Sequence, residues 1–178
     1  DLHSVNEVEK AAKCVDIIQI PAFLCRQSEL IQAAAKTGRH VNIKKGQFLS
    51  AQSMQFAVEK IKDSGNTNII LTERGTMFGY NDLVVDYRSI PIMKSYGYPV
   101  VLDVTHSLQE PNNISGLTGG KPKLIETIAK AGVAIGIDGI FLETHFSPND
   151  SKSDSKNMLD LKSLEDLLIN LLRIRKSI

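Results

Sequence analysis

The stretch IILTERGTMFGYNDLVVD, from Ile69 to Asp86, joins an apolar run to Glu73, Arg74 and Gly75 and then to a loop rich in glycine and aromatic residues. The apolar run does not alternate with polar residues, and a continuous run of this kind is typical of a strand buried on both faces of a parallel sheet. Charged side chains are rarely buried without a partner. The stretch therefore predicts a buried parallel strand that carries polar chemistry at its end.

Four other runs share this continuous apolar character, at residues 15–21 (VDIIQIP), 40–45 (HVNIKK), 98–106 (YPVVLDVTH) and 138–145 (DGIFLETH). Helical patterns lie between and around the runs, at residues 5–14, 28–38, 50–65, 90–97, 121–132 and 163–178. Ser28 is the candidate N-cap of the second helix. Parallel strands need a crossover connection, and each intervening helix supplies one. The order therefore predicts an α/β fold with a parallel sheet.

Length and composition favour one globular domain. The chain has 178 residues, enough for a hydrophobic core, so we expect residues 1–178 to form a single domain. The 21 basic and 20 acidic residues give a formal net charge of +1 with no basic stripe, so no nucleic-acid partner is expected. No apolar run is long enough for a bilayer, so no membrane association is expected. Cys14 and Cys25 do not make a disulfide framework, which favours a reducing, cytoplasmic setting.

In a parallel α/β protein, functional residues gather in the loops that follow the C-terminal ends of the strands. Each of the five runs carries charged or imidazole side chains at that end. They are Arg26 after the first run, Lys44, Lys45 and Gln47 at the second, Glu73 and Arg74 at the third, Asp103 and His106 at the fourth, and Glu143 and His145 at the fifth. These strand ends predict one shared site.

Two kinds of chemistry are represented among these residues. Lys44 and Arg74 are cations on neighbouring strands, and together they suit a phosphate or a carboxylate. His106, Glu143 and Asp154 offer nitrogen and oxygen ligands from separate loops, which suit a divalent transition metal. The residue types therefore favour a site that binds anions and a metal ion.

Simpler interpretations exist for the same residues. Glu73 and Arg74 could form a surface ion pair. Lys44 and Lys45 could be a solvated strand end. His106 could cap its strand through hydrogen bonds to the backbone.

The two longest loops follow the last two runs. Gly116, Gly119 and Gly120 lack the strand and helix context of a phosphate-binding loop, so we expect them to give a lid its flexibility. In the second loop, residues 150–154 are expected to be a solvated polar run, apart from Asp154.

Five motifs carry a resemblance to a known family. DIIQIPAFLCRQ, VNIKKGQF, ERGTMFGYNDLVVD, DVTHSLQ and GIFLETHFSPNDSKSDSKNML closely resemble, in this order, the 3-deoxy-D-manno-octulosonate 8-phosphate synthases, also called KDO-8-phosphate synthases. The motifs around Phe23, Gln47 and Tyr80 separate this family from related synthases that condense phosphoenolpyruvate with erythrose 4-phosphate or with hexosamines.

The resemblance implies a (β/α)8 TIM barrel, usually a homotetramer, that acts as a transferase in lipopolysaccharide (KDO) biosynthesis. The family condenses phosphoenolpyruvate with D-arabinose 5-phosphate and water and releases phosphate. Two alternatives are a sister synthase that uses another aldose, such as erythrose 4-phosphate, and a non-catalytic barrel fragment that serves as a subunit.

The resemblance also assigns roles to residues. Lys44 and Arg74 are expected to hold phosphoenolpyruvate, helped by the backbone near Ala22, and Gln47 is expected to lie close to the reacting centre. Arg26 resembles an arginine that reaches the sugar phosphate of a neighbouring subunit, with Phe23 at the same interface.

Metal binding is implied in the same way. His106, Glu143 and Asp154 match three of the four ligands of metal-dependent members, and His106 is expected at the catalytic centre together with Gln47 and Lys44. The string from Ser153 to Lys156 is closer to metal-dependent than to metal-independent members. A divalent metal such as Zn, Fe or Mn is therefore expected, and no organic cofactor.

The sequence departs from the family in extent. It matches roughly the last five β/α units of the barrel and lacks the first two strands, most of the third and the segment that supplies a catalytic lysine. Five strands cannot close an eight-stranded barrel. We therefore expect this sequence to be part of a longer polypeptide.

Overall fold

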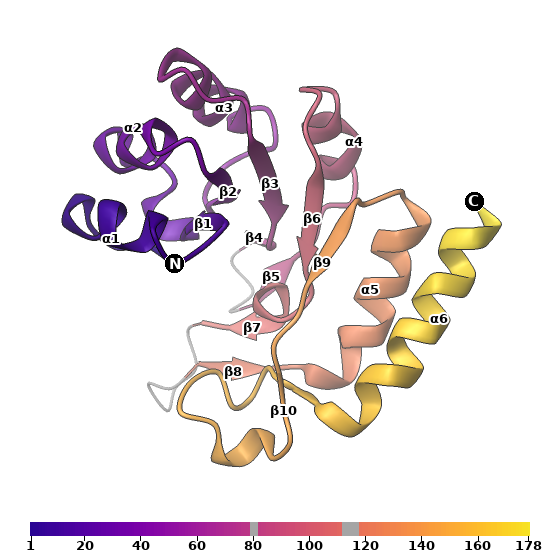
Figure 1. The fold of residues 1–178 in the computed structure, drawn as a ribbon. Helices are drawn as coiled ribbons and strands as arrows, with labels where there is room; N and C mark the ends of the chain where they lie inside the picture. The colour runs from indigo at the N-terminus through magenta and orange to yellow at the C-terminus, as the bar shows by residue number, and fades with distance from the viewer. Residues whose placement is uncertain (79–81, 112–117) are drawn as a thin grey trace. The chain divides into compact units, whose positions relative to one another are not determined.

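The computed structural model describes residues 1–78, 82–111 and 118–178 (Figure 1). These residues form two compact units. Unit 1 comprises Asp1–Glu73 and Arg88–Val100, and unit 2 comprises Arg74–Tyr87 and Val101–Ile178. Tyr80 and Gly116, both singled out above, lie outside the described residues. Among the described helices, none is both long enough and apolar enough to cross a membrane.

Unit 1 contains a parallel sheet. Its strands β1 (Ile17–Ile20), β2 (His40–Lys44) and β3 (Ile69–Glu73) pair in that order. The sheet interior is made by aliphatic side chains with almost no exposed surface, including Ile20, Ile43 and Leu71. The parallel pairing and the burial confirm what the continuous apolar runs predicted.

Helices accompany the sheet of unit 1. They are α1 (Val8–Ala12), which a 3-10 turn at Val5–Glu7 precedes, α2 (Ser28–Lys36), α3 (Met54–Asp63) and α4 (Ser89–Lys94). Helix α2 contacts α3 and β2, while α3 and α4 contact β3. The Ser28 prediction is wrong by one residue: Gln27 is the N-cap, with an extended backbone, and Ser28 is already helical.

At Val5–Glu7, the Glu7 carboxylate accepts hydrogen bonds from the backbone of His3 and Ser4, which lowers the pKa of Glu7.

Unit 2 contains a second parallel pair. Strand β6 (Val100–Asp103) pairs with β9 (Gly139–Phe141) from Val101 onward. Helices α5 (Ile125–Ala134) and α6 (Leu164–Ser177) pack side by side with their N-termini at the same end (Figure 1). The α/β class with parallel strands is thus confirmed in both units.

The described part of unit 2 also contains three pairs of very short strands, of which the sequence predicted only β10, as the end of the run at residues 138–145. Antiparallel pairs form between β4 (Thr76–Met77) and β5 (Leu83–Val84), and between β7 (Gln109–Glu110) and β8 (Gly119–Gly120); β10 (Thr144–His145) pairs in parallel with β11 (Leu159–Asp160). Strands of two residues are too short to produce a hydrophobic period.

The fifth predicted strand is divided in the structure. Strand β9 ends at Phe141, and the chain forms β10 only two residues later. At the break, the backbone N–H of Glu143 donates to Oγ1 of Thr105. The Glu143 carbonyl accepts a hydrogen bond from the backbone of Leu159. These bonds replace the strand ladder at the point where Glu143 enters the site.

Helix α5 lies very close to β6 at Gly132. A Cβ atom at this position would lie 2.5 Å from Cδ2 of Leu102 and 3.1 Å from Cδ1 of Ile137. Leu102 has no exposed surface and immediately precedes Asp103. The missing side chain at Gly132 therefore lets the helix pack tightly on the strand that carries Asp103 to the site.

Gly132→Ala in the full-length protein tests this packing. In an open helix the change would stabilise by about 1 kcal/mol. Here the clash with Leu102 should instead destabilise by about 1–3 kcal/mol, measured as the free energy of unfolding in urea. Gly132→Ala combined with Leu102→Ala should lose less than the sum of the two single changes. A more stable Gly132→Ala protein would contradict the close packing.

Candidate active site

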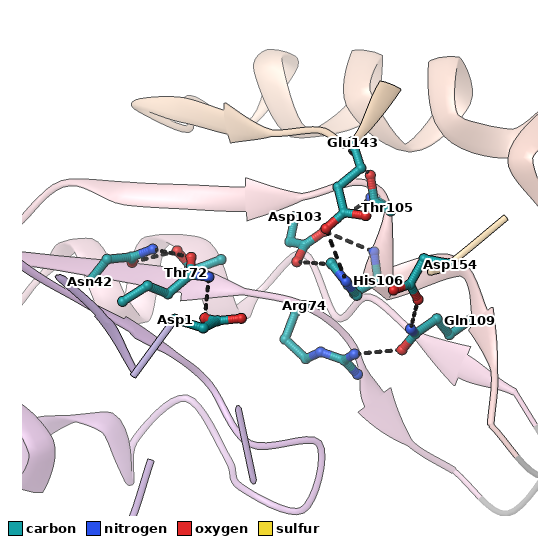
Figure 2. Close-up of polar contacts among 11 residues, drawn as sticks. Asp1, Asn42, Thr72, Arg74, Asp103, Thr105, His106, Gln109, Glu143 and Asp154 are labelled. Carbon is teal, nitrogen blue, oxygen red and sulfur yellow. Dashed lines mark hydrogen bonds and ion pairs between the residues drawn. The ribbon is translucent and has the colours of Figure 1, made fainter. Parts of the chain in front are cut away.

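Three potential metal ligands come together in unit 2. One ligand atom each from His106, Glu143 and Asp154 lies within 4.8 Å of the other two, and all three residues are half-buried. They come from the loops after β6, after β9 and before β11 (Figure 2). One imidazole nitrogen and two carboxylate oxygens are donors that a divalent transition metal accepts, and a three-ligand set leaves positions for water or substrate. The residues present therefore fit the expected metal.

Asp103 determines how the His106 ring is presented. Its Oδ1 accepts the backbone N–H groups of Thr105 at 3.0 Å and of His106 at 2.8 Å, and its Oδ2 lies 2.8 Å from Nδ1 of His106. An ionised carboxylate only accepts hydrogen bonds, so the imidazole proton resides on Nδ1. Nε2 is then left as the lone-pair donor for a metal, the arrangement in which a carboxylate orients a metal-binding histidine.

Backbone contacts place Glu143 opposite this ring. Its N–H donates to Oγ1 of the fully buried Thr105 at 2.8 Å, and its Oε1 lies 3.5 Å from Nε2 of His106. The ring of Phe141 lies beside the imidazole, with 5.7 Å between the ring centroids. Both ligands are thus held by contacts that arise where β6 and β9 end.

Asp154 is linked to Arg74 through Gln109. Nε2 of Gln109 donates to Oδ1 of Asp154 at 2.9 Å, and Oε1 of Gln109 accepts from Nη2 of Arg74 at 2.8 Å (Figure 2). Arg74 is only 5% exposed, so it is not a solvated surface cation. Sequence reasoning missed Gln109, although the position directly after the DVTHSL stretch was a signal for it.

Buried charges also lie at the ends of β2 and β3 in unit 1. Lys44 and Lys45 are 5% and 0% exposed, which excludes the solvated-strand-end interpretation. Nζ of Lys45 lies 3.5 Å from Oε1 of the fully buried Glu73 and donates to the Leu49 carbonyl at 3.2 Å. Glu73 therefore has a buried lysine as its partner, and the interpretation of Glu73 and Arg74 as a surface ion pair is wrong.

The other predicted substrate residues of unit 1 lie at one edge of its sheet. Ala22, Phe23 and Arg26 directly follow β1, and Gln47 follows β2. Because β1 and β2 are parallel neighbours, these positions share the same edge. Ala22 and Gln47 are buried, whereas Arg26 is exposed and Phe23 is 72% exposed.

A chain of polar side chains crosses the sheet of unit 1, and sequence reasoning missed most of it. Oγ1 of Thr72 donates to Oδ1 of Asn42 at 2.7 Å, and Nδ2 of Asn42 donates to Oε1 of Gln19 at 2.9 Å. Nε2 of Gln19 then donates to the Asp1 carboxylate at 2.5 Å. Asn42 and Thr72 are buried, and each has a hydrogen-bond partner, as buried polar side chains normally do.

His145 was expected at the strand-end site and is placed differently. Its Nδ1 contacts the backbone of Ser147, and its ring stacks on Phe146 with 4.3 Å between the centroids. Within the described part of the chain, the ligand cluster consists of His106, Glu143 and Asp154. His145 is the last residue of β10, and its ring contacts Ser147 and Phe146.

Comparison with known proteins supplies the family. Residues 1–177 match the sequence profile of the DAHP synthetase I family. The chain belongs to the DAHP synthetase I family. This family is of the TIM-barrel class, which agrees with the parallel strands and intervening helices of both units.

Curated relatives of this DAHP synthetase I family member carry the name 2-dehydro-3-deoxyphosphooctonate aldolase. The protein from Trichlorobacter lovleyi is 55% identical to this chain, and the matched region covers 94% of this chain and 62% of that relative. Those of Koribacter versatilis and Rhizobium meliloti are 50% and 51% identical, covering 100% and 97% of this chain and 65% and 61% of their own lengths. This name denotes the same enzyme as KDO-8-phosphate synthase. The relatives therefore confirm the resemblance that the five motifs carry. The chain spans less than two thirds of the length of these relatives.

Asp103→Asn in the full-length protein tests the orientation of His106. The amide oxygen is needed by the two backbone N–H donors, so the amide nitrogen would face Nδ1 and force the imidazole proton onto Nε2. Affinity for Zn²⁺ should fall by about 10–100-fold, measured by competition with a chelating dye. Asp150→Asn is the matched control, because Asp150 lies in the loop of Asp154 but bonds Ser147. Equal affinity in both variants would contradict the assigned role.

Proposed function

We propose that the chain forms the metal-binding part, and much of the phosphoenolpyruvate-binding part, of an enzyme that makes 3-deoxy-D-manno-octulosonate 8-phosphate. The reaction condenses phosphoenolpyruvate with D-arabinose 5-phosphate and water and releases phosphate. The observation that carries the proposal is the 55% identity, over 94% of the chain, to a relative named for this activity. The ligand cluster of His106, Glu143 and Asp154 supports it independently.

The charges of the site suit these substrates. Both are phosphorylated, and phosphoenolpyruvate also carries a carboxylate. Lys44 and Arg74 are nearly buried, and a cation in a site with little water stabilises an anion far more than one in bulk solvent. We assign to them the phosphate and carboxylate of phosphoenolpyruvate, with the backbone near Ala22 as a further donor.

In the reaction, C3 of phosphoenolpyruvate attacks the aldehyde carbon of the sugar, and the new alkoxide takes up a proton. Water adds to C2 and loses one proton, which balances the proton taken up by the alkoxide. The bond between C2 and the phosphate oxygen then breaks, phosphate leaves with the bonding electrons and takes the remaining hydroxyl proton, and C2 becomes a ketone. Positioning two anions in contact is the main requirement of this chemistry. We place Gln47, a buried amide at the end of β2, near the reacting carbons.

His106, Glu143 and Asp154 would hold the divalent metal. When bound, such an ion polarises a water or a substrate oxygen. Asp103 keeps the proton of His106 on Nδ1, and Gln109 keeps one oxygen of Asp154 in a fixed direction. The protein's own contribution is therefore to present three correctly oriented donors.

We further propose the assembly that the resemblance implies. The chain would supply about five of the eight β/α units of one (β/α)8 barrel domain. Arg26 and Phe23 would lie near a subunit interface in a cytoplasmic homotetramer. The 72% exposure of Phe23, a large apolar side chain, supports an interface at this position.

Two alternatives remain to be tested against this proposal. The name of the matching family profile favours a sister synthase that uses a different aldose, such as erythrose 4-phosphate. The second alternative is a non-catalytic barrel fragment that serves as a subunit. The buried Lys44 and Arg74 and the three-ligand cluster weigh against the fragment, because nothing in a scaffold requires them.

Phosphate release by the full-length protein tests the proposal. With phosphoenolpyruvate and D-arabinose 5-phosphate, release should occur and should stop after rigorous chelation, then resume when Mn²⁺ or Zn²⁺ is restored. Release only with erythrose 4-phosphate would favour the sister synthase. Release with neither sugar would contradict the enzyme, and release that survives chelation would contradict the metal requirement.

Arg74→Ala tests the anion site. Removing a buried cation should lower kcat/KM by about 100-fold or more. The free energy of unfolding should fall by only about 1 kcal/mol, for the lost hydrogen bond to Gln109. Arg39→Ala is the control, because Arg39 bonds the Ala12 carbonyl and Asp16 in unit 1 without a predicted substrate role. A large loss of stability with intact turnover would show Arg74 to be structural.

A further inference from the structure

One asparagine in the loop of Asp154 is completely buried. Asn157 has no exposed surface, although the loop around it is polar and its neighbours are half-buried or exposed. Its backbone N–H donates to the Asp154 carbonyl at 2.8 Å and closes a four-residue turn. Its side-chain Nδ2 donates to the Gly119 carbonyl at 3.3 Å. Asn157 therefore connects the turn that begins at Asp154 to strand β8.

The contact with β8 leaves no space at Gly120. A Cβ atom there would lie 1.8 Å from Oδ1 and 2.5 Å from Cγ of Asn157, and 2.7 Å from the Lys156 carbonyl. Distances this short are incompatible with any side chain at residue 120 while Asn157 stays in place. The glycine thus serves close packing at this position, where a flexible lid was expected from the sequence.

The same two strands hold Asp154 from a second side. Gly120 of β8 pairs with Gln109 of β7, and the side chain of Gln109 donates to Oδ1 of Asp154. A closed circuit results, in which Asp154 connects to Asn157 through the turn, Asn157 connects to β8, β8 pairs with β7, and Gln109 of β7 returns to Asp154. Loosening one connection leaves the Asp154 carboxylate held from one side only.

Asp154 needs such support because of its backbone. Its φ of +50° lies in the left-handed region, and it is the one non-glycine residue with positive φ in the described part of the chain. Residues in this region persist where surrounding contacts over-determine them, and they gather at functional sites. One such contact is the hydrogen bond from the Asn157 backbone to the Asp154 carbonyl, which closes the turn.

We propose that Asn157 is a positioning residue for the metal site: by fastening the Asp154 turn to Gly119 and Gly120, it sets the direction of the Asp154 carboxylate. The inference rests on the proposed metal centre of His106, Glu143 and Asp154. Asn157 itself touches neither the metal nor the substrate. Its effect is on how tightly, and in what geometry, a metal is held.

Titration of the full-length, metal-free protein with Co²⁺ tests the inference. Co²⁺ reports its own coordination through its visible absorption spectrum. Asn157→Ala should bind Co²⁺ about 10–100-fold more weakly than the unaltered protein, the range seen when residues behind metal ligands are removed. Its absorption bands should also change in intensity, because the Asp154 carboxylate is then held from one side only. Asn157→Ser keeps a polar side chain that is too short to reach the Gly119 carbonyl, and it should do the same if the alanine variant folds poorly.

Asn66→Ala is the matched control. Asn66 is also a buried asparagine, 4% exposed, and its Nδ2 joins two backbone carbonyls, those of Ala35 and Arg39, in unit 1. Its loss should lower the thermal midpoint while Co²⁺ affinity of the folded protein stays unchanged. If Asn66→Ala weakens Co²⁺ binding as much as Asn157→Ala does, the effect is general destabilisation and the positioning role is overturned.

Gly120→Ala approaches the same contact from the other side. The added methyl group should displace Asn157 and reproduce the loss of Co²⁺ affinity. If both changes act through one contact, the double variant should bind Co²⁺ no more weakly than whichever single variant has the lower Co²⁺ affinity. Additive losses would show that the two residues act separately and would overturn the circuit.

The remaining outcomes separate this inference from the proposed function. Unchanged Co²⁺ affinity and spectrum in Asn157→Ala would overturn the positioning role and leave the metal centre intact. Equal Co²⁺ binding by the unaltered protein and by His106→Ala would remove the metal centre itself, and the role of Asn157 with it.

Discussion

The carboxylate of Asp103 is the acceptor on which the candidate metal site of unit 2 depends. It has no exposed surface, and it accepts two backbone N–H groups and faces the Nδ1 atom of His106. A charged group so deeply buried is costly unless each oxygen is satisfied, and here both oxygens are. The two backbone bonds turn the chain at the end of β6, and the contact with Nδ1 fixes the imidazole. A change at Asp103 would therefore alter both the strand end and the orientation of His106.

Burial of charge follows a similar rule in unit 1. Glu73 and Lys45 are both fully buried and lie 3.5 Å apart, and Lys45 also reaches a backbone carbonyl. Replacing such a pair by apolar side chains often costs nothing or even stabilises a protein, so a buried pair is weak support for a purely structural role. The pair lies at the same strand ends as the cation Lys44, where we propose that phosphoenolpyruvate binds.

The sequence predicted the features that depend on a repeated local signal. Continuous apolar runs identified the parallel strands, and the rule that sites follow strand ends, together with the family motifs, identified His106 and Glu143. It could not identify Asn157, because nothing local distinguishes a buried amide from a solvated one in a polar loop. Gln109 directly follows the DVTHSL stretch, but no local signal showed that its amide connects Arg74 to Asp154. His145 and Ser28 show the limit of boundaries: both lie within two or three residues of an element end, where tertiary bonds such as that from Glu143 to Thr105 decide the outcome.

Each unit contains a chain of hydrogen-bonded side chains. In both, the end group fixes which side chain donates and which accepts at every step. In unit 2 a guanidinium can only donate and an ionised carboxylate can only accept, so the amide of Gln109 between Arg74 and Asp154 has one possible orientation. In unit 1 the Asp1 carboxylate fixes the amide of Gln19, which fixes that of Asn42, which makes Thr72 the donor. In both chains one acceptor-only group orders every side chain behind it. A change of charge at Arg74 would reach Asp154 through the single amide of Gln109. By linkage, a change at Asp154 would affect Arg74 equally.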